Sequence, residues 1–196
     1  MISKNKTGRI FFFRYLSMMF DAMDQKKCSI PHFANAPKSW VDSSDKVQMQ
    51  FGAFLIHGHG ARCIAWDDRL KKDANLWATA LLEILKDLRK EYEAKGKQWP
   101  HTLYLQCDNA ADNKNLVMYT VCQILRDKGI FKKVKLSFLP VGHTHEDVDA
   151  CFGALSRKLQ HADAPTLAHM EKLWKEAWKG LEWFKYVEVS FFFLLK

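Results

Sequence analysis

Two hydrophobic periods alternate along this chain, and their order constrains the fold more than any other feature. Apolar runs of strand length cover residues 10–20, 47–57, 61–66, 101–107 and 134–141, and most end at turn-forming residues. Runs of this length and composition are typical of buried β-strands. Gly58 and Gly60, between the second and third runs, predict a hairpin turn.

Elsewhere the apolar residues recur at helical spacing. Residues 77–92 give the clearest amphipathic helix, and Gly96 follows as a stop signal. A shorter helix ends at Lys128-Gly129, with Asp112 or Asn113 as its expected N-cap. Two more helices are expected after residue 145 and after Pro165, with the buried positions Val148, Cys151, Phe152, Leu155 and Leu159, then Leu167, Met170, Trp174, Ala177 and Leu181.

The predicted order is strand, strand, strand, helix, strand, helix, strand, helix. A strand meander followed by βα units indicates an α/β fold, a mixed sheet with helices on both faces. This is also the β-β-β-α-β-α-β-α element order of the RNase H-like fold. We expect residues 10–160 to form that core and residues 161–196 a C-terminal helical extension. Its apolar end, residues 190–196, suggests either a truncated chain or a terminal strand.

The composition and net charge of the chain indicate which classes of molecule it is expected to bind. With 196 residues, 48% of them hydrophobic and 27% charged, the chain is expected to form one globular domain. A net charge of +8 favours a polyanionic partner, nucleic acid before an anionic membrane. A solvated basic surface is the alternative, because Lys and Arg are spread along the chain. No stretch is long and apolar enough to span a bilayer.

The cysteines and the N-terminal residues indicate in which cellular compartment the protein is expected. The five cysteines are odd in number and form no Cys-x-x-Cys pair, so disulfides and a structural zinc knuckle are not expected. Residues 4–20 loosely imitate a signal peptide, but Arg14 interrupts the apolar run and no small-residue cleavage site follows. We therefore expect a nuclear or cytoplasmic protein that is not secreted.

Two aspartates follow apolar strand runs, Asp21 and Asp108. Ligand groups in open α/β sheets gather at strand ends, where a rigid strand gives way to a loop. For one aspartate alone, the preference of Asp for turns would be explanation enough.

A third acid is expected at the start of the helix after His145. Thr144 and Asp147 fit a capping box, which gives Asp147 a structural role. On a helical wheel, Asp149 borders the apolar face and can point at the sheet end, whereas Glu146 lies nearer solvent. Asp149 is therefore the expected third ligand and Glu146 the reserve, because the helix dipole alone could explain an acid at Glu146.

Three gathered carboxylates require a cation. Two like charges ~4 Å apart repel by roughly 4 kcal/mol at an effective dielectric of about 20. Mg²⁺ or Mn²⁺ would relieve this repulsion, since hard divalent ions prefer oxygen ligands. A pair of such ions suits phosphodiester chemistry.

A zinc site is the rival interpretation. His143-Thr-His145-Glu-Asp147 reproduces the His-x-His-x-Asp opening of the motif in metallo-β-lactamase-like hydrolases. That motif continues with a histidine directly after the aspartate, and here Val148 takes its place. In the preferred interpretation His143 and His145 flank the metal.

Four segments carry a family resemblance: Asp21-Ala-Met-Asp-Gln25, Leu103-Tyr-Leu-Gln-Cys-Asp-Asn109, Asn113-Lys-Asn115 and Leu139-Pro-Val-Gly-His-Thr-His-Glu-Asp-Val-Asp149. They resemble an uncharacterised domain family of transposon-derived eukaryotic proteins, a branch of the integrase/transposase RNase H-like superfamily with a DDE/D triad. The resemblance runs from about residue 12 to about residue 159. It implies Asp21, Asp108, and Asp149 or Glu146 as the three acids. Ala22 departs from the expected Gly, which matters only if the backbone there needs a positive φ.

The resemblance implies metal-dependent cleavage and transfer of DNA strands by a DDE/D-type polynucleotidyl transferase or nuclease. Such a protein would act in the nucleus, form a homo-oligomer if active, and use no small-molecule substrate. Because no DNA end-binding module is visible, the chain resembles an isolated catalytic core, a fragment or a domesticated remnant. Two alternatives stay open: a non-catalytic nucleic-acid-binding module on the same fold, and a zinc-dependent hydrolase.

Overall fold

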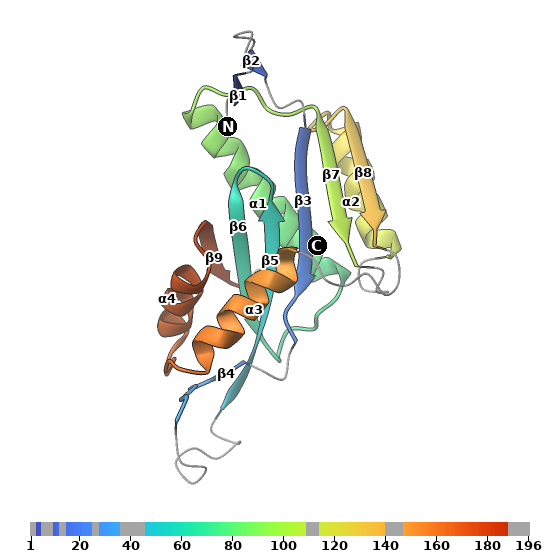
Figure 1. The fold of residues 1–196 in the computed structure, drawn as a ribbon. Helices are drawn as coiled ribbons and strands as arrows, with labels where there is room; N and C mark the ends of the chain where they lie inside the picture. Colours follow the sequence, from blue (N-terminus) through green and yellow to red (C-terminus); the bar gives the residue numbers. More distant parts are fainter. Residues whose placement is uncertain are drawn as a thin grey trace. The chain divides into compact units, whose positions relative to one another are not determined.

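The computed structural model describes residues 3–4, 10–11, 15–24, 28–35, 46–108, 114–139 and 147–187 (Figure 1). It is a mixed α/β structure, as predicted, with sheet strands and helices alternating in its second half. The elements are β1 (Ser3–Lys4), β2 (Ile10–Phe11), β3 (Tyr15–Ala22), β4 (Ser29–Ile30), β5 (Val47–Ile56), β6 (Gly60–Asp67), α1 (Ala74–Ala94), β7 (Thr102–Cys107), α2 (Leu116–Asp127), β8 (Lys133–Phe138), α3 (Asp147–Leu159), α4 (Leu167–Ala177) and β9 (Leu181–Tyr186).

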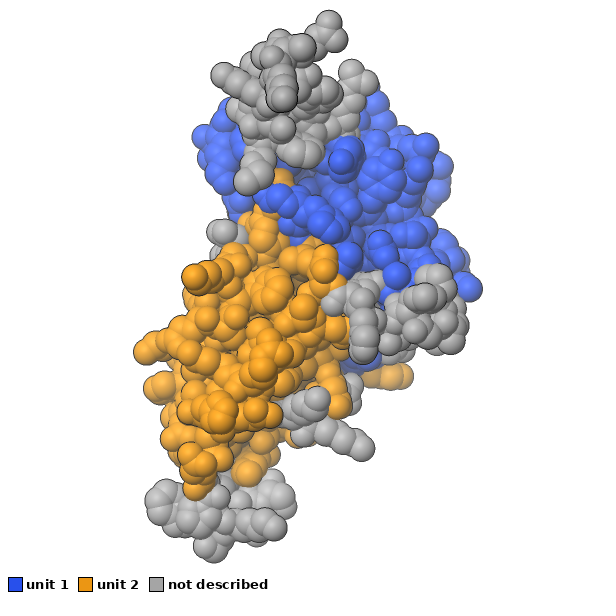
Figure 2. All heavy atoms as spheres, in the orientation of Figure 1, with its two compact units in different colours: residues 1–19, 56–58, 72–142 blue, residues 20–55, 59–71, 143–196 orange. Residues whose placement is uncertain are grey.

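The chain divides into two compact units, coloured separately in Figure 2. Unit 1 comprises residues 1–19, 56–58 and 72–142, and unit 2 comprises residues 20–55, 59–71 and 143–196. Strand β3 contributes its first residues to unit 1 and its last to unit 2. The predicted division into a 10–160 core and a 161–196 extension stays a prediction. None of the helices in the described ranges is long and apolar enough to cross a membrane.

Unit 1 contains the strand order β8-β7-β3 with α1 and α2. Strands β7 and β8 are parallel, with Tyr104 opposite Lys135 and Cys107 opposite Phe138. Helix α2 contacts both β8 and α1, and Figure 1 shows α2 behind β8.

Side-chain caps fix where the unit 1 helices begin. The Asp73 carboxylate accepts hydrogen bonds from the backbone N–H groups of Asn75 and Leu76 at the start of α1. Helix α2 is capped by Asn115, whose side-chain oxygen lies 3.1 Å from the backbone nitrogen of Met118. The prediction of Asp112 or Asn113 as this cap was therefore wrong, because the helix begins later and Asn115 directly precedes it.

Unit 2 contains the strand order β3-β5-β6-β9, and β4 pairs antiparallel with β5. The turn between β5 and β6 has Gly58 and Gly60 at φ of 80°, a backbone that favours glycine. The predicted hairpin is thereby confirmed.

The core of unit 2 centres on Trp174 of α4. Its ring lies 5.7 Å from that of Phe51 on β5 and 6.0 Å from that of Phe152 on α3. Trp174 and Phe51 are almost fully buried. One side chain thus joins the sheet to both helices of the unit.

The C-terminal segment departs from its predicted form. The fourth helix was expected to reach Leu181, but α4 ends at Ala177 and Leu181 begins a strand that runs parallel to β6. Gly180, at φ of 101°, provides the reversal that an L side chain rarely adopts. Leu181 lies at helical spacing from the apolar residues of α4, so the sequence pattern does not show that the helix ends before it.

The carboxylate of Asp67 links the end of β6 to the end of β9 and forms an ion pair with Arg69. Asp67 is only 3% exposed, and its carboxylate accepts hydrogen bonds from the Arg69 guanidinium and, at 2.5 Å, from the Tyr186 hydroxyl. These bonds, chiefly those from Arg69, lower the pKa of Asp67 from 3.8 to about 2. Beside them the Val187 nitrogen bonds the Ala65 oxygen at 2.8 Å.

Replacing Trp174 with alanine tests the aromatic centre of unit 2. We expect Trp174→Ala to lower the free energy of unfolding by roughly 3–5 kcal/mol, the usual loss when a buried large aromatic is truncated. Urea denaturation measures this loss. Leu116→Ala is the control, since Leu116 is 79% exposed and its truncation should leave the midpoint almost unchanged. Equal midpoints for both variants would contradict the role of Trp174.

The Asp67 ion pair predicts a pH-dependent stability. Because the folded pKa is near 2 and the unfolded value is 3.8, the stabilisation is complete above the unfolded pKa and is lost as pH falls through 2. Asp67→Asn should lower the free energy of unfolding by roughly 1–2 kcal/mol at pH 7, after allowance for the exposure of Arg69, and by progressively less below pH ~4. Urea midpoints of wild type and variant across this range test the difference, with exposed Asp68→Asn as control. A difference that grows on acidification would refute this assignment.

Candidate acidic site

Asp21 lies near the end of β3 on the face opposite the core. The buried side chains Leu16, Met18 and Phe20 alternate along this strand, so Asp21 points the other way and is half-buried. Two contacts hold the strand end: the Phe20 ring stacks on Phe54 at 5.0 Å, and the nitrogen of Met23 bonds the oxygen of Phe51 at 2.8 Å.

The backbone at Ala22 contributes directly to the position of Asp21. The Ala22 nitrogen lies 2.7 Å from Oδ1 of Asp21 and donates a hydrogen bond to it. No non-glycine residue in the described parts of the chain has a positive φ, so the backbone at Ala22 does not require glycine. Alanine at this position is compatible with an intact site.

Asp108 directly follows β7, as predicted. Leu103, Leu105 and Cys107 are each 0% exposed, and Asp108 is half-buried at the next position. The oxygen of Cys107 accepts a hydrogen bond of 3.1 Å from the nitrogen of Leu139, which extends the pairing with β8 beyond the strand. The backbone before Asp108 is therefore held from both sides.

Asp149 lies in the first turn of α3 together with Asp147. Asp147, the first described residue of the helix, is exposed, while Asp149 is half-buried. The predicted capping box of Thr144 and Asp147 stays a prediction, because Thr144 lies outside the described residues. The predicted apolar face is confirmed, since its five residues are the buried residues of α3: Val148, Cys151, Phe152, Leu155 and Leu159.

The same aromatic cluster supports both acids of unit 2. Phe51 bonds the backbone of Met23, two residues after Asp21, and its ring packs on Trp174. Trp174 in turn packs on Phe152, three residues after Asp149.

The expected ligand set extends beyond the described residues. Asp21 and Asp149 belong to unit 2 and Asp108 to unit 1. Within the described ranges, no group of three or more His, Cys, Asp or Glu side chains is arranged to hold a metal ion. Glu146, His143 and His145 lie outside those ranges, as do Thr144, Asp112 and Asn113.

None of the five cysteines, all of which lie in the described ranges, forms a disulfide bond in this structure. Burial raises the pKa of the Cys122 thiol to about 11 and that of Cys151 to about 12. Burial likewise raises the pKa of Cys63. These thiols stay protonated near neutral pH, and they are poor nucleophiles and metal ligands in that form.

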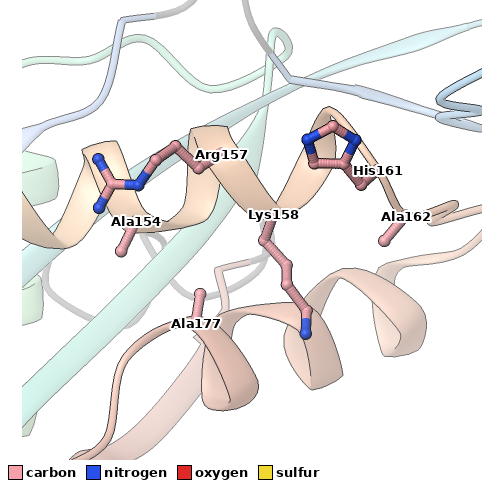
Figure 3. Close-up of a pocket in the computed structure, with 6 residues that line it drawn as sticks. All are labelled: Ala154, Arg157, Lys158, His161, Ala162 and Ala177. Carbon is pink, nitrogen blue, oxygen red and sulfur yellow. The ribbon is translucent and has the colours of Figure 1, made fainter.

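The structure has a basic pocket between α3 and α4 that was not predicted from the sequence. It measures about 450 Å³ and is lined by Ala154, Arg157, Lys158, His161, Ala162 and Ala177 (Figure 3). Lys158 extends from α3 toward α4, where its Nζ lies 2.9 Å from Oε2 of Glu176 and lowers the pKa of that carboxyl. The spacing of Ala154, Arg157, Lys158 and His161 on one helical face was the available signal. The lining suits an anion better than a metal ion.

Two solved structures resemble this chain in fold. One is "Mos1 transposase paired-end complex with left transposon end", at 11% identity and a TM-score of 0.49, covering 94% of this chain and 51% of that chain. The other is "Crystal structure of the Mos1 Strand Transfer Complex", at 12% identity and a TM-score of 0.51, covering 94% of this chain and 50% of that chain. The second match, with the higher TM-score, shows a transposase-like fold. The chain spans about half the length of both structures.

Sequence comparison places the chain in a family. No curated protein sequence matches it. The family model described as "Domain of unknown function (DUF7869)" matches residues 39–193, most of the chain, and this chain therefore belongs to that family.

Proposed function

We propose that this chain is a transposase-type catalytic domain that cleaves and transfers DNA strands with divalent metal ions. The observation that carries the proposal is the position of the three predicted acids on a transposase-like fold. Asp21 and Asp108 stand at strand ends, and Asp149 stands in the first turn of a helix. Each is half-buried and held by an ordered element. Carboxylates carried by strand ends and helix starts are ligands of the type that metal-assisted chemistry uses.

The proposal includes an assignment of the fold to the RNase H-like type. We assign the chain to the RNase H-like, DDE/D branch because β3, β5, β6, α1, β7, α2, β8 and α3 follow one another in the predicted order. The parallel pairing of β7 and β8 supports the assignment, since α2 connects them as the helix of a βαβ unit.

The donor chemistry of the three acids fits Mg²⁺ or Mn²⁺. Carboxylate oxygens are the ligands that these hard ions prefer, and a cation offsets the mutual repulsion of the acids. The bound ions would activate the attacking hydroxyl or water and stabilise the leaving oxygen. The chain itself orients the ligands, as the Ala22 nitrogen does for Oδ1 of Asp21.

The substrate and setting follow from the same proposal. A net charge of +8 attracts a polyanion, and the similar solved structures are named as a transposon-end complex and a strand transfer complex. DNA as substrate places the action of this domain in the nucleus. Joining two DNA ends favours a homo-oligomer, and the chain is then a catalytic core or a domesticated remnant of one.

Asp149 is the proposed third acid and Glu146 the reserve. The support for Asp149 is its half-buried position beside the buried face of α3, since Val148 and Cys151 are each 1% exposed. Asp147, exposed at the helix start, is a matched neighbour for testing this choice.

A cleavage assay tests the proposal. Labelled DNA is incubated with the full chain and Mn²⁺, and Asp21→Asn, Asp108→Asn and Asp149→Asn should each reduce cleavage. We expect a loss at least as large as the roughly 10- to 100-fold that follows loss of a group supporting a metal ligand. Asp147→Asn should cleave at the wild-type rate, as should Glu146→Gln.

The same assay separates the alternatives. Equal cleavage by wild type and Asp108→Asn would remove Asp108 from the site. DNA binding that needs neither metal nor acids, with no cleavage by wild type, would indicate the non-catalytic module. Stoichiometric zinc in protein purified without added metal, lost in His143→Ala, would indicate the zinc hydrolase.

A further inference from the structure

The sheet of unit 1 has one face packed on helices and one face open to solvent. On the packed side the side chains Leu103, Leu105 and Cys107 are fully buried. Phe138 faces the same side, where its ring packs on Tyr119 of α2 at 6.2 Å. Tyr104 alternates with these residues along β7, so it lies on the opposite face of the sheet, where it is 37% exposed.

Two tyrosines and two lysines lie on this open face. Tyr15 of β3, 49% exposed, meets Tyr104 of β7 edge to face with ring centroids 5.7 Å apart. Lys135, opposite Tyr104 in the register, places its Nζ 5.1 Å from the centre of that ring. Lys133 precedes it on the same side of β8 and is also exposed.

The charged residues on the strands of this face are lysines. The strand residues of unit 1, 15–19, 102–107 and 133–138, include no acidic residue. Exposed aromatic rings beside lysines suit a ligand that carries both flat rings and negative charge. Single-stranded nucleic acid has both, whereas a duplex presents mainly its phosphates.

We propose that the open face of Tyr15, Tyr104, Lys133 and Lys135 binds single-stranded DNA by base stacking. An exposed cation–π contact is weak, so a base can replace the Lys135 ammonium on the Tyr104 ring. The ammonium then pairs with a phosphate of the same strand. Tyr15, at right angles to Tyr104, contacts the edge of the stacked base.

The bound strand would lead toward Asp108, which belongs to the same unit. Tyr104, Gln106 and Asp108 occupy alternate positions along and just beyond β7, so they follow one another on one side of the chain. A strand laid along β7 therefore ends at Asp108. In this respect the inference rests on the proposed function, because it makes the substrate near Asp108 an unpaired strand.

Binding of a labelled oligothymidine of about 15 nucleotides to the full chain tests the inference, with fluorescence anisotropy measured in EDTA. Tyr104→Ala should weaken binding roughly 5- to 100-fold, and Tyr104→Phe should bind as wild type, because stacking needs the ring and not the hydroxyl. Lys135→Ala should also reduce the slope of log affinity against log salt by about 0.7, whereas Tyr104→Ala should leave the slope unchanged.

Matched controls lie on the other face of the same unit. Tyr119→Ala removes an aromatic side chain of 46% exposure, and Lys114→Ala removes a lysine that lies 5.8 Å from the Phe138 ring. Neither should change oligothymidine binding by more than about two-fold. An abasic oligonucleotide of equal length should bind wild type and Tyr104→Ala equally, since it offers phosphates without bases.

Several outcomes would overturn the inference. The inference fails if Tyr104→Ala binds oligothymidine as tightly as wild type. It also fails if Tyr104→Ala and Tyr119→Ala lose equal affinity for oligothymidine. A Tyr104→Ala variant that binds DNA normally but changes from dimer to monomer in sedimentation would show a protein interface instead. Metal-dependent cleavage that survives without single-strand binding would overturn this inference alone, and wild-type cleavage by Asp108→Asn would overturn the proposed function alone.

Discussion

Side-chain alternation along β3 and β7 is the constraint on which the rest of this structure depends. Each strand commits every second residue to the core, so the residues between them are directed to the opposite face. On β3 the buried series Leu16, Met18, Phe20 leaves Asp21 outward, and on β7 the series Leu103, Leu105, Cys107 leaves Tyr104 outward. Core packing therefore fixes the direction of the proposed functional side chains, although none of them contributes to that core.

The sequence predicted the structural features that leave a pattern among neighbouring residues. The buried face of α3 and the hairpin at Gly58 and Gly60 are as predicted, because burial and positive φ each leave a local pattern. The cap of α2 and the end of α4 were misplaced, since several polar residues compete for a cap and apolar spacing does not reveal a reversal at Gly180. Strand β9 was missed because its pairing with β6 depends on residues far apart in the chain.

The candidate site was predicted one residue at a time rather than as an assembly. Strand ends and a helix start can be recognised from local pattern, and Asp21, Asp108 and Asp149 have those positions. The ionic environment of an acid depends on tertiary partners instead. Asp67 illustrates this: it also ends a strand, but Arg69 and Tyr186 engage its carboxylate. A strand-end aspartate is thus a proposed ligand at Asp21 and Asp108 and a structural hydrogen-bond acceptor at Asp67, and only the folded partners separate the two roles.

The pairing of β9 with β6 has a consequence for where the domain can be cut. Strand β6 is buried along nearly its whole length, and an uncovered apolar edge strand is a template for pairing with other chains. Residues 181–186 cover that edge, and the hydrogen bond from Tyr186 to Asp67 secures their far end. A version of the gene that stopped after α4 would retain all three proposed acids but expose β6, so aggregation would remove it before loss of chemistry did. Residues 181–186 therefore protect the edge of β6 from pairing with other chains.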